Sequence, residues 1–358
     1  MVMPLLRKTE KVASRKSHIH ASRRTDIAFV LFNKYDYAMT EFNRGRPLKL
    51  GVSSCLLGEK VRFDGNHKLD AYVSGTLGRF FDFVSICPEI AIGMEVPRPT
   101  IRLEGNPEHP RLVGVHDKNL DATDAMEAFS ARKIPTLKGI SGYILKRKSP
   151  SCGMERVRVY GDKEEIRYGS GLFARALMNA YPLLPVEEEG RLGDPNLRDN
   201  FLERVFAYRR WQNLEMAGLT KQALIRFHTI HKLSLMAHGP ETYRELGRMI
   251  ASVGKRPLEQ VAEEYITGFM KGLQHRATTE RQTNVLHHLM GYLKNTLQKE
   301  DKVELLEVIE AYRKERVPLV VPITLLKHHF RHNPHPYIAE QVYLNPPPEE
   351  MLLRRGGV

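Results

Sequence analysis

The stretch LKLGVSSC (48–55) is a short apolar run that ends at a cysteine, and this pattern returns twice along the chain. DFVSI (82–86) leads directly into Cys87, and GYILK (142–146) runs into a loop that carries Cys152. Such strands, separated by helix-length segments, predict a Rossmann-like α/β domain with a mainly parallel sheet. We expect the first strand at 48–54, helices at 69–82, 120–134 and 171–181, a last short strand at 183–186, and an irregular excursion in VPRPTIRLEG (96–105).

Each of the three cysteines lies just past the carboxyl end of a predicted strand. In open α/β sheets these ends share one edge, where ligands bind, so thiols far apart in the sequence can meet there. Pro88 and Pro150 keep the neighbouring backbone out of regular pairing, and Gly153 lets a ligand approach closely. The chain has no C-x-x-C pair, which argues against a four-thiolate zinc site, whereas three thiolates suit a cluster with one iron left open. The alternative is that the thiols simply fill a core, since free cysteine is among the most buried residue types.

The chain is basic: 55 Lys and Arg residues stand against 42 Asp and Glu in 358 residues, a formal net charge of +13. The excess lies in residues 1–50 and 191–358, whereas residues 51–190 carry equal numbers of both signs. Lys and Arg release counterions when they neutralise phosphates, so this composition favours a nucleic-acid partner. The alternative is that basic tails and helix faces are simply solvated.

The cysteine count bears on where the protein works. Three cysteines are an odd and sparse number, unlike a secreted disulfide scaffold, and they indicate a reducing cytoplasm. No uncharged apolar run approaches the ~20 residues of a membrane span, and the first residues lack the apolar core of a signal peptide. We therefore expect a soluble, cytoplasmic protein with no membrane partner.

We expect three parts in the chain. Residues 1–47 form a basic extension that is at least partly disordered, because it contains few apolar residues. Residues 48–190 form the α/β domain. Residues 191–358 form an all-α domain, since amphipathic stretches of helical length follow one another there. The predicted role of this last domain is RNA binding or substrate positioning.

Three stretches resemble the signatures of the thiouracil desulfidase family: VSSCLLGEKVRFDG (52–65), ICPEIAIGMEVPRP (86–99) and YILKRKSPSCG (143–153). The part behind them, from RDNFLERVFAYRRW to YLNP, resembles the helical domain often fused behind such enzymes. The fused form is similar to the bacterial tRNA 4-thiouridine desulfidases. The resemblance implies a 4Fe-4S cluster with one iron open, held by Cys55, Cys87 and Cys152.

This cofactor suits the reaction that the resemblance implies, removal of sulfur from a thiolated uracil. Thiolates are soft ligands that suit iron–sulfur clusters, and a soft thiocarbonyl sulfur binds an open iron in preference to an oxygen. Water can then add to the ring carbon without net redox change. Because the water must lose a proton and the departing sulfide must gain one, a carboxylate and hydroxyls are expected nearby. The predicted catalytic residues are Glu89, Ser141 and Asp64.

The predicted substrate-binding residues lie beside the same motifs. They are hydroxyls that can orient water or the cluster sulfides and cations that can meet phosphates, namely Ser53, Ser54, Arg98, Lys146, Ser149 and Ser151. These positions also have ordinary interpretations. Glu89 can cap the segment after Pro88, Asp64 and Gly65 can form a turn, and the KRK run can be a solvated loop.

The helical part carries ten of the fifteen histidines and one basic–aromatic run. His228 and His231, and likewise His328 and His332, have the spacing of metal ligands on a helix, but no third ligand follows at a fixed spacing. Interleaved basic and aromatic residues can stack on splayed RNA bases, whereas packing of the rings between helices is the alternative. The run comprises Arg204, Tyr208, Arg209, Arg210 and Trp211.

The favoured function is desulfuration of 4-thiouridine in thiolated tRNA, which gives uridine and sulfide. One alternative is the same reaction on free thiouracil or a thionucleoside, with the helical domain serving oligomerisation. Another is a non-catalytic RNA-binding protein whose cysteines fill a core. The basic flanks and the fused domain favour the polymer as the substrate.

Overall fold

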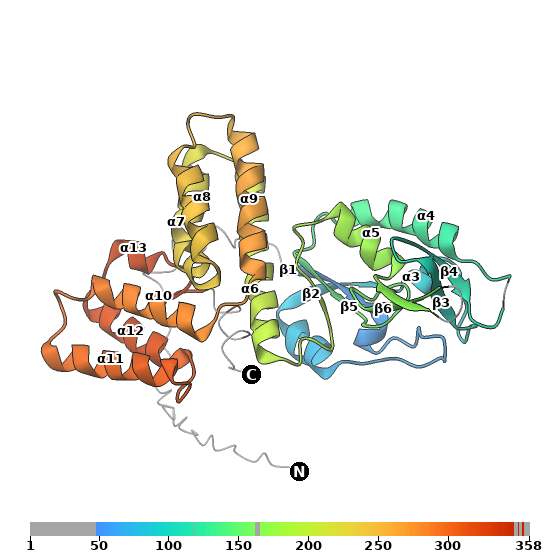
Figure 1. Ribbon diagram of the computed structural model, residues 1–358, viewed down its shortest axis with the longest axis horizontal. Coiled ribbons are helices and arrows are strands. Elements are labelled where there is room, and N and C mark those ends of the chain that lie inside the picture. The colour runs from blue at the N-terminus through green and yellow to red at the C-terminus, as the bar shows by residue number, and fades with distance from the viewer. Residues whose placement is uncertain (1–47, 118, 162–164, 347–349, 351–352, 354–358) are drawn as a thin grey trace, which may run out of the picture.

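A computed structural model describes residues 48–117, 119–161 and 165–346 of the chain, together with 350 and 353 (Figure 1). The predicted basic extension, residues 1–47, lies outside this range. Within the described residues, two four-stranded sheets occupy the first part of the chain, and from residue 195 onward the elements are helices. The predicted fold class, an α/β part with a mainly parallel sheet followed by an all-α part, is confirmed.

The first sheet follows the apolar runs of the sequence and is parallel throughout. Ser53 of β1 pairs with Ile86 of β2, and Val52 of β1 pairs with Ile144 of β5. The carboxyl ends of the strands therefore lie at one edge. The strand order is β2-β1-β5-β8, with bounds Phe81–Ile86, Leu48–Ser53, Gly142–Leu145 and Val186–Glu188.

Helices bury both faces of this sheet. α4 and α5 lie side by side over one face, where Tyr143 and Val186 belong to their apolar core (Figure 1). The first half of α6 covers the other face and packs in the same core as Leu50 and Val52. These helices span Thr123–Lys133, Leu172–Ala180 and Pro195–Ala217, and short helical turns stand at Ser54–Leu57, Pro88–Ala91 and Ile134–Leu137.

A second sheet stands where the sequence predicts an irregular excursion, and that prediction is wrong. β3 pairs antiparallel with β4 and parallel with β6, and β6 pairs antiparallel with β7. In these strands Leu103, Leu112 and Val159 are buried but their charged neighbours are not, and this broken apolar pattern is a weak signal. The bounds of β3, β4, β6 and β7 are Ile101–Asn106, His109–Gly114, Val157–Tyr160 and Ile166–Gly169.

Two other elements differ from their predictions. The helix predicted at 69–82 is much shorter, a π-helical turn at Tyr72–Thr76 followed by a 3-10 turn at Leu77–Arg79. The last strand, β8, begins where the predicted strand at 183–186 ends. Its two glutamates are buried, and an apolar pattern cannot select buried carboxylates.

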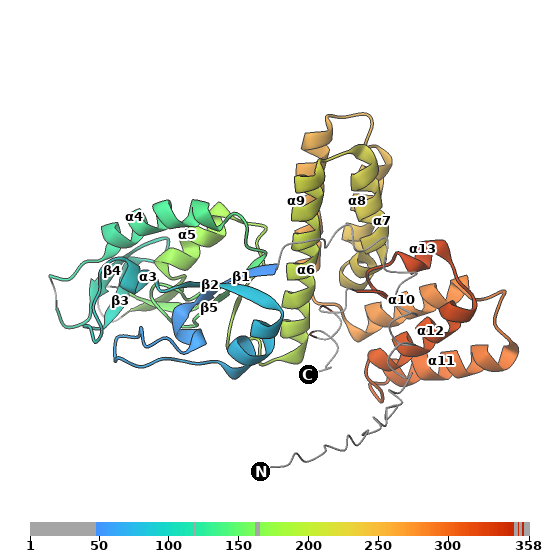
Figure 2. The same ribbon diagram turned by 180° about the vertical axis from the view of Figure 1, so that it is seen from behind.

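The helical part has two groups of helices (Figures 1 and 2). α6 to α9 stand together as a bundle, and α10 to α13 form a second group beside its lower end. Among the described residues no helix is both long and apolar enough to cross a membrane. The bounds of α7 to α13 are Lys221–His238, Pro240–Ala251, Leu258–Gln274, Thr279–Tyr292, Lys299–Arg313, Val320–His332 and Pro336–Ala339.

Helix α6 belongs to the cores of both parts. Its first half packs on the parallel sheet, where the ring centroids of Phe206 and Phe81 lie 5.8 Å apart. Five residues further on, Trp211 is buried in the helical core, edge-on to Phe227 with 5.3 Å between centroids. Of the two interpretations of this ring, packing between helices is confirmed, and burial excludes the stacking of Trp211 on RNA bases.

The paired histidines of α7 are internal. His228 hydrogen-bonds the Tyr265 hydroxyl at 3.2 Å, and burial lowers the pKa of this histidine to about 4. His231 hydrogen-bonds the carbonyl oxygen of Phe227 at 2.8 Å. Both contacts are within the helical core, so the i, i+3 spacing here serves packing.

We expect Phe206→Ala to destabilise the protein by about 3–5 kcal/mol, because it empties a buried site between α6 and the sheet. Urea unfolding followed by far-ultraviolet circular dichroism measures this loss. Met216→Ala is the control on the same helix: its side chain is exposed, and its effect should stay within about 0.5 kcal/mol. Equal unfolding midpoints for the two variants would contradict the packing of α6 on the sheet.

Candidate functional site

The three cysteines lie at the carboxyl edge of the parallel sheet. Cys55 is in the 3-10 turn that follows β1, Cys87 follows β2 directly as the N-cap of the short helix α3, and Cys152 lies in a turn beyond β5. The Ser53 hydroxyl accepts a hydrogen bond from the Lys146 amide at 3.0 Å, and the same side chain lies close enough to the Cys152 thiol to lower its pKa. The ends of β1 and β5 are thereby tied to the cysteine loop, and the structure brings the thiols to the edge at which the sequence places them.

The thiols lie close enough to influence one another's ionisation, and none forms a disulfide. Burial, followed by the charge of Cys87, raises the pKa of Cys55 to about 11. Burial raises the pKa of Cys152 well above its usual value, and Glu89 and the other two thiols add to the effect. The thiols are therefore protonated at neutral pH unless a cation binds and displaces their protons.

The donor set suits an iron–sulfur core better than a single ion. A single zinc ion draws its thiolates to about 2.3 Å from one centre. Among the described residues, no group of three His, Cys, Asp or Glu side chains has that arrangement. In a 4Fe-4S cluster each thiolate binds a different iron, so the thiols stand further apart around the core. Three soft sulfur donors at one edge of the sheet suit that group by their chemistry.

The Glu89 carboxylate lies beside two of the thiols, and its charge raises the pKa of both Cys87 and Cys152. The Ser151 hydroxyl donates to its Oε1 at 2.9 Å, and the buried Arg98 donates from Nε to its Oε2 at 3.1 Å. The Glu89 side chain remains 15 % exposed. Hydrogen bonds therefore hold both carboxylate oxygens of Glu89, the predicted general base, near the thiols. A general base must be positioned in this way to transfer a proton to or from a substrate.

The loop that carries Cys152 is tightly built. The Ser149 hydroxyl accepts a hydrogen bond from the Cys152 amide at 3.0 Å, so this serine shapes the loop. Gly153 leaves no room for a side chain, since an added Cβ would lie 2.3 Å from a neighbouring valine. Beyond it, the Met154 amide donates to the buried carboxylate of Glu188 at 2.9 Å. Each contact restricts where the Cys152 thiol can stand.

Two of the predicted catalytic residues are not part of this arrangement. Ser141 precedes β5, so it lies at the opposite edge of the sheet, where its amide donates to the carbonyl of Lys49 at 2.8 Å and its hydroxyl is held by α6. Asp64 stands in an exposed turn, where it accepts from the Asn66 amide at 3.1 Å. The placement of Ser141 in the site is corrected, and Ser151 is the hydroxyl that contacts the carboxylate.

Two of the predicted binding residues make internal contacts. The hydroxyl oxygens of Ser54 and Ser85 lie 2.7 Å apart in a hydrogen bond. The Lys146 ammonium pairs with Glu189, and their side chains are only 16 % and 10 % exposed. Lys146 therefore organises the protein and is not a free cation for a phosphate.

The sequence reasoning missed the glutamates of VEEE (186–189). Glu188 holds the segment after Cys152, and Glu189 pairs with Lys146. A signal for them exists in the sequence, because three consecutive acidic residues follow an apolar strand at the edge where the cysteines lie.

Comparison with known proteins divides the chain into two matched regions. Residues 50–189 match the 2-thiouracil desulfurase family, and residues 232–348 match a family described only as a protein of unknown function, DUF1722. Residues 50–189 therefore form a domain of the 2-thiouracil desulfurase family. This domain is fused to the DUF1722 domain that follows it.

Individual relatives cover parts of the chain. It is 31% identical to the uncharacterized protein YbgA of Escherichia coli (strain K12) over 161 residues, which is 45% of this chain and 95% of that protein. It is also similar to a solved structure described as the 4Fe-4S-dependent thiouracil desulfidase TudS, at 30% identity and a TM-score of 0.32. That match covers 41% of this chain and 93% of the solved one.

We expect Glu188→Ala to loosen the Cys152 loop, because it removes the acceptor of the Met154 amide. A hydrogen bond to a charged group contributes about 1.5–3 kcal/mol, so amide hydrogen exchange in peptides covering 150–156 should become about 10–100 times faster. Glu165→Ala, which removes an exposed carboxylate, is the control and should leave that exchange unchanged. Unaltered protection in Glu188→Ala would show that the carboxylate does not hold the loop.

Proposed function

We propose that this protein hydrolyses the carbon–sulfur bond of 4-thiouridine in tRNA, leaving uridine and releasing sulfide. The observation that carries the proposal is the placement of three interacting thiols and the Glu89 carboxylate at one edge of the sheet. Cys55, Cys87 and Cys152 would hold a 4Fe-4S cluster, which when bound supplies a soft Lewis acid with one iron open to a thiocarbonyl sulfur. Membership of the 2-thiouracil desulfurase family supports the reaction class.

Glu89 is the proposed general base. Its carboxylate takes a proton from the water that attacks the ring carbon and returns that proton to the departing sulfide. The water oxygen becomes the new carbonyl oxygen when its second proton leaves by the same carboxylate. Both bonds to sulfur break, sulfur departs with the two protons as hydrogen sulfide, and no electron is gained or lost. Ser151 and Arg98 hold the carboxylate in one orientation for both transfers.

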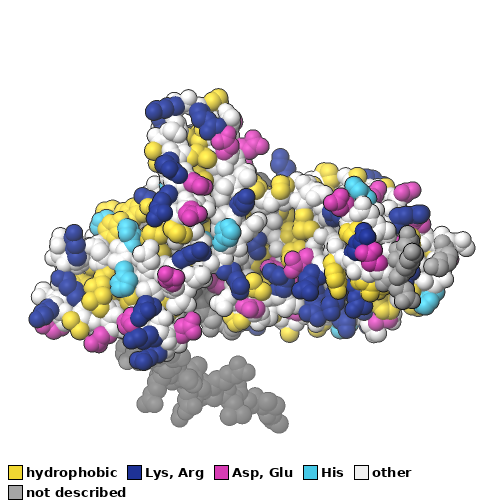
Figure 3. Space-filling view, viewed as in Figure 1, with side chains coloured by type: hydrophobic (Ala, Val, Ile, Leu, Met, Phe, Trp, Pro, Cys, Tyr) yellow, Lys and Arg dark blue, Asp and Glu magenta, His cyan; other side chains and the backbone are white. Residues whose placement is uncertain are grey.

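The arrangement of positive charge supports a polymeric substrate. Residues 51–190 carry equal numbers of acidic and basic side chains. On the face seen in Figure 3, however, Lys and Arg side chains gather along the lower part of the α/β domain, towards α6. A positive surface of this kind attracts a phosphate backbone, and a free base cannot make use of it.

A half-exposed aromatic group on the helical domain also suits RNA. The rings of Tyr292 and Tyr337 stack with 5.6 Å between centroids, and His335 lies edge-on to Tyr292 at 4.9 Å. The Lys232 ammonium lies 5.8 Å from the ring centroid of Tyr243. Aromatic planes beside cations bind unstacked bases, so this surface favours a nucleic acid over a free nucleobase.

Protein reconstituted without oxygen should bleach the near-ultraviolet absorbance of thiolated tRNA and release sulfide. We expect kcat/KM on tRNA to exceed that on free 4-thiouridine by about a hundredfold or more, because only the polymer engages the basic surface. Cys152→Ser should lose both bound iron and sulfide release. A kcat/KM on the free nucleoside that equals or exceeds the value on tRNA would instead support a small-molecule substrate.

Glu89→Gln should lower kcat by about 10²–10⁴, the usual contribution of general acid–base catalysis, while bound iron stays at the wild-type level. Asp64→Asn is the matched control, since this carboxylate lies in an exposed turn, and it should retain wild-type kcat. Ser151→Ala should also lower kcat, whereas Ser141→Ala at the opposite edge should not. Loss of turnover in Asp64→Asn with full activity in Glu89→Gln would show that the base is misassigned.

A further inference from the structure

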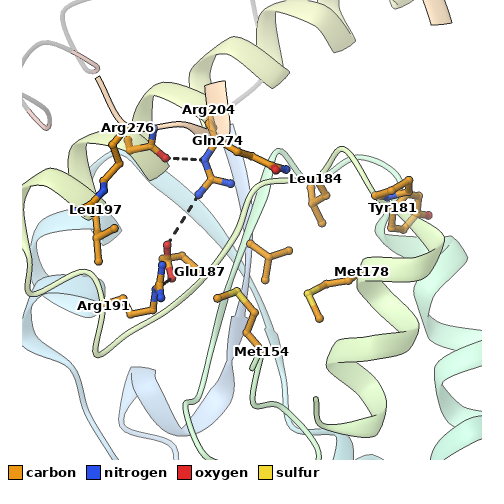
Figure 4. A pocket seen from close by; sticks show the side chains of 13 residues that line it. Met154, Met178, Tyr181, Leu184, Glu187, Arg191, Leu197, Arg204, Gln274 and Arg276 are labelled. Atoms are coloured by element: carbon orange, nitrogen blue, oxygen red, sulfur yellow. Dashed lines mark hydrogen bonds and ion pairs between the residues drawn. The ribbon is translucent and has the colours of Figure 1, made fainter. Parts of the chain in front are cut away.

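A cavity of about 550 Å³ lies between β8, the end of α5, α6 and the end of α9 (Figure 4). None of the three cysteines lines it, so it is separate from the proposed desulfurase site. Its volume is that of a small-molecule site. The proposed sulfur removal makes no use of this cavity.

One wall of the cavity carries a buried cation. The Arg204 side chain is only 11 % exposed, its Nε donates to Asn200 at 3.0 Å, and its Nη2 lies 3.9 Å from the Glu187 carboxylate. Within the described residues no acceptor takes a hydrogen bond from its two terminal amino groups, and the guanidinium lines the cavity (Figure 4). These amino groups open onto the cavity, and an anionic ligand there would accept hydrogen bonds from them.

A second guanidinium is available on the same wall. Arg276 lines the cavity and its side chain is exposed. Its charge lowers the pKa of Asp194. The Asp194 carboxylate already accepts hydrogen bonds from backbone amides as the N-cap of α6. Arg191 also lines the cavity, but it pairs with Glu187 at 2.6 Å and with a second glutamate at 2.8 Å. Glu187 itself lines the cavity, and its pair with Arg204 is long, at 3.9 Å, so Arg276 and Arg204 are the cations least engaged by the protein.

The opposite wall is apolar. Met154, Met178 and Leu184 line it together with Tyr181 (Figure 4). Unbranched thioethers adapt to a flat ring and make favourable sulfur–aromatic contacts. Met154 lies two residues beyond Cys152, so a ligand in the cavity touches the segment that carries this thiol.

We propose that the cavity binds a phosphate-bearing nucleotide, with its phosphate against Arg204 and Arg276 and its base against the two methionines. Guanidinium groups bind phosphate through paired N–H donors, and the apolar wall accepts the flat ring. The nucleotide is either a free mononucleotide or one residue of an RNA strand, which present the same chemistry. The proposal does not depend on the desulfurase reaction, because binding here needs neither iron nor a thiolated base.

Calorimetric titration of the full-length protein with uridine 5′-monophosphate tests this site. Uridine, which lacks the phosphate, should bind with an affinity at least about tenfold lower. Arg276→Gln should weaken nucleotide binding about tenfold, and because this side chain is exposed the variant should fold. Arg204→Met should weaken it further, and Met178→Trp should abolish it by filling the apolar half. Arg248→Gln, an exposed arginine of α8 outside the cavity, is the control and should bind as the wild type does.

Competition between a short oligouridylate and the mononucleotide would identify RNA as the source of the ligand, and its absence would identify a free nucleotide. No binding of uridine 5′-monophosphate, or an affinity that Arg276→Gln and Met178→Trp both leave unchanged, would overturn the proposal. The titration contains no thiolated substrate, so a failure of sulfur release leaves its result unaffected.

Discussion

The pairing of β1 between β2 and β5 is the constraint on which the proposed site depends. Because the three strands run in parallel, the segments that follow them meet at one edge, although the cysteines are widely separated in the sequence. A shift of one residue in this register would turn each side chain to the other face of the sheet. Ser53 reinforces the pairing at its end, since its hydroxyl accepts a hydrogen bond from the Lys146 amide and its side chain lies near the Cys152 thiol.

The charges around this edge explain why the thiols and the carboxylate belong together. Burial disfavours all three thiolates, and the neighbouring Glu89 further disfavours those of Cys87 and Cys152, so the edge is electrostatically suited to a bound cation. Arg98 offsets part of the negative charge and fixes the carboxylate. The glutamates at the end of β8 act on the framework: Glu188 holds the cysteine loop, and Glu189 holds Lys146.

The amino-acid sequence predicts the strands that are buried along most of their length, but not the strands that are only partly buried. The strands of the parallel sheet are apolar along most of their length, so their positions and the edge that carries Cys55, Cys87 and Cys152 were predictable. The second sheet is half exposed, and charges interrupt its pattern. The prediction put Ser141 in the site because a motif does not show on which side of a strand a serine lies. Ser141 precedes β5, so it lies at the edge of the sheet opposite the cysteines. The buried glutamates escaped notice because carboxylates are rarely buried unless paired.

The central claim is that the three thiols share one iron–sulfur core with an iron that no cysteine binds. Mössbauer spectroscopy of the iron-57 protein, reconstituted without oxygen, tests it most directly. We expect a 4Fe-4S spectrum in which one iron differs from the other three and changes when thiolated RNA is added. Four equivalent irons that do not respond to the RNA, or iron bound only as isolated ions, would contradict it.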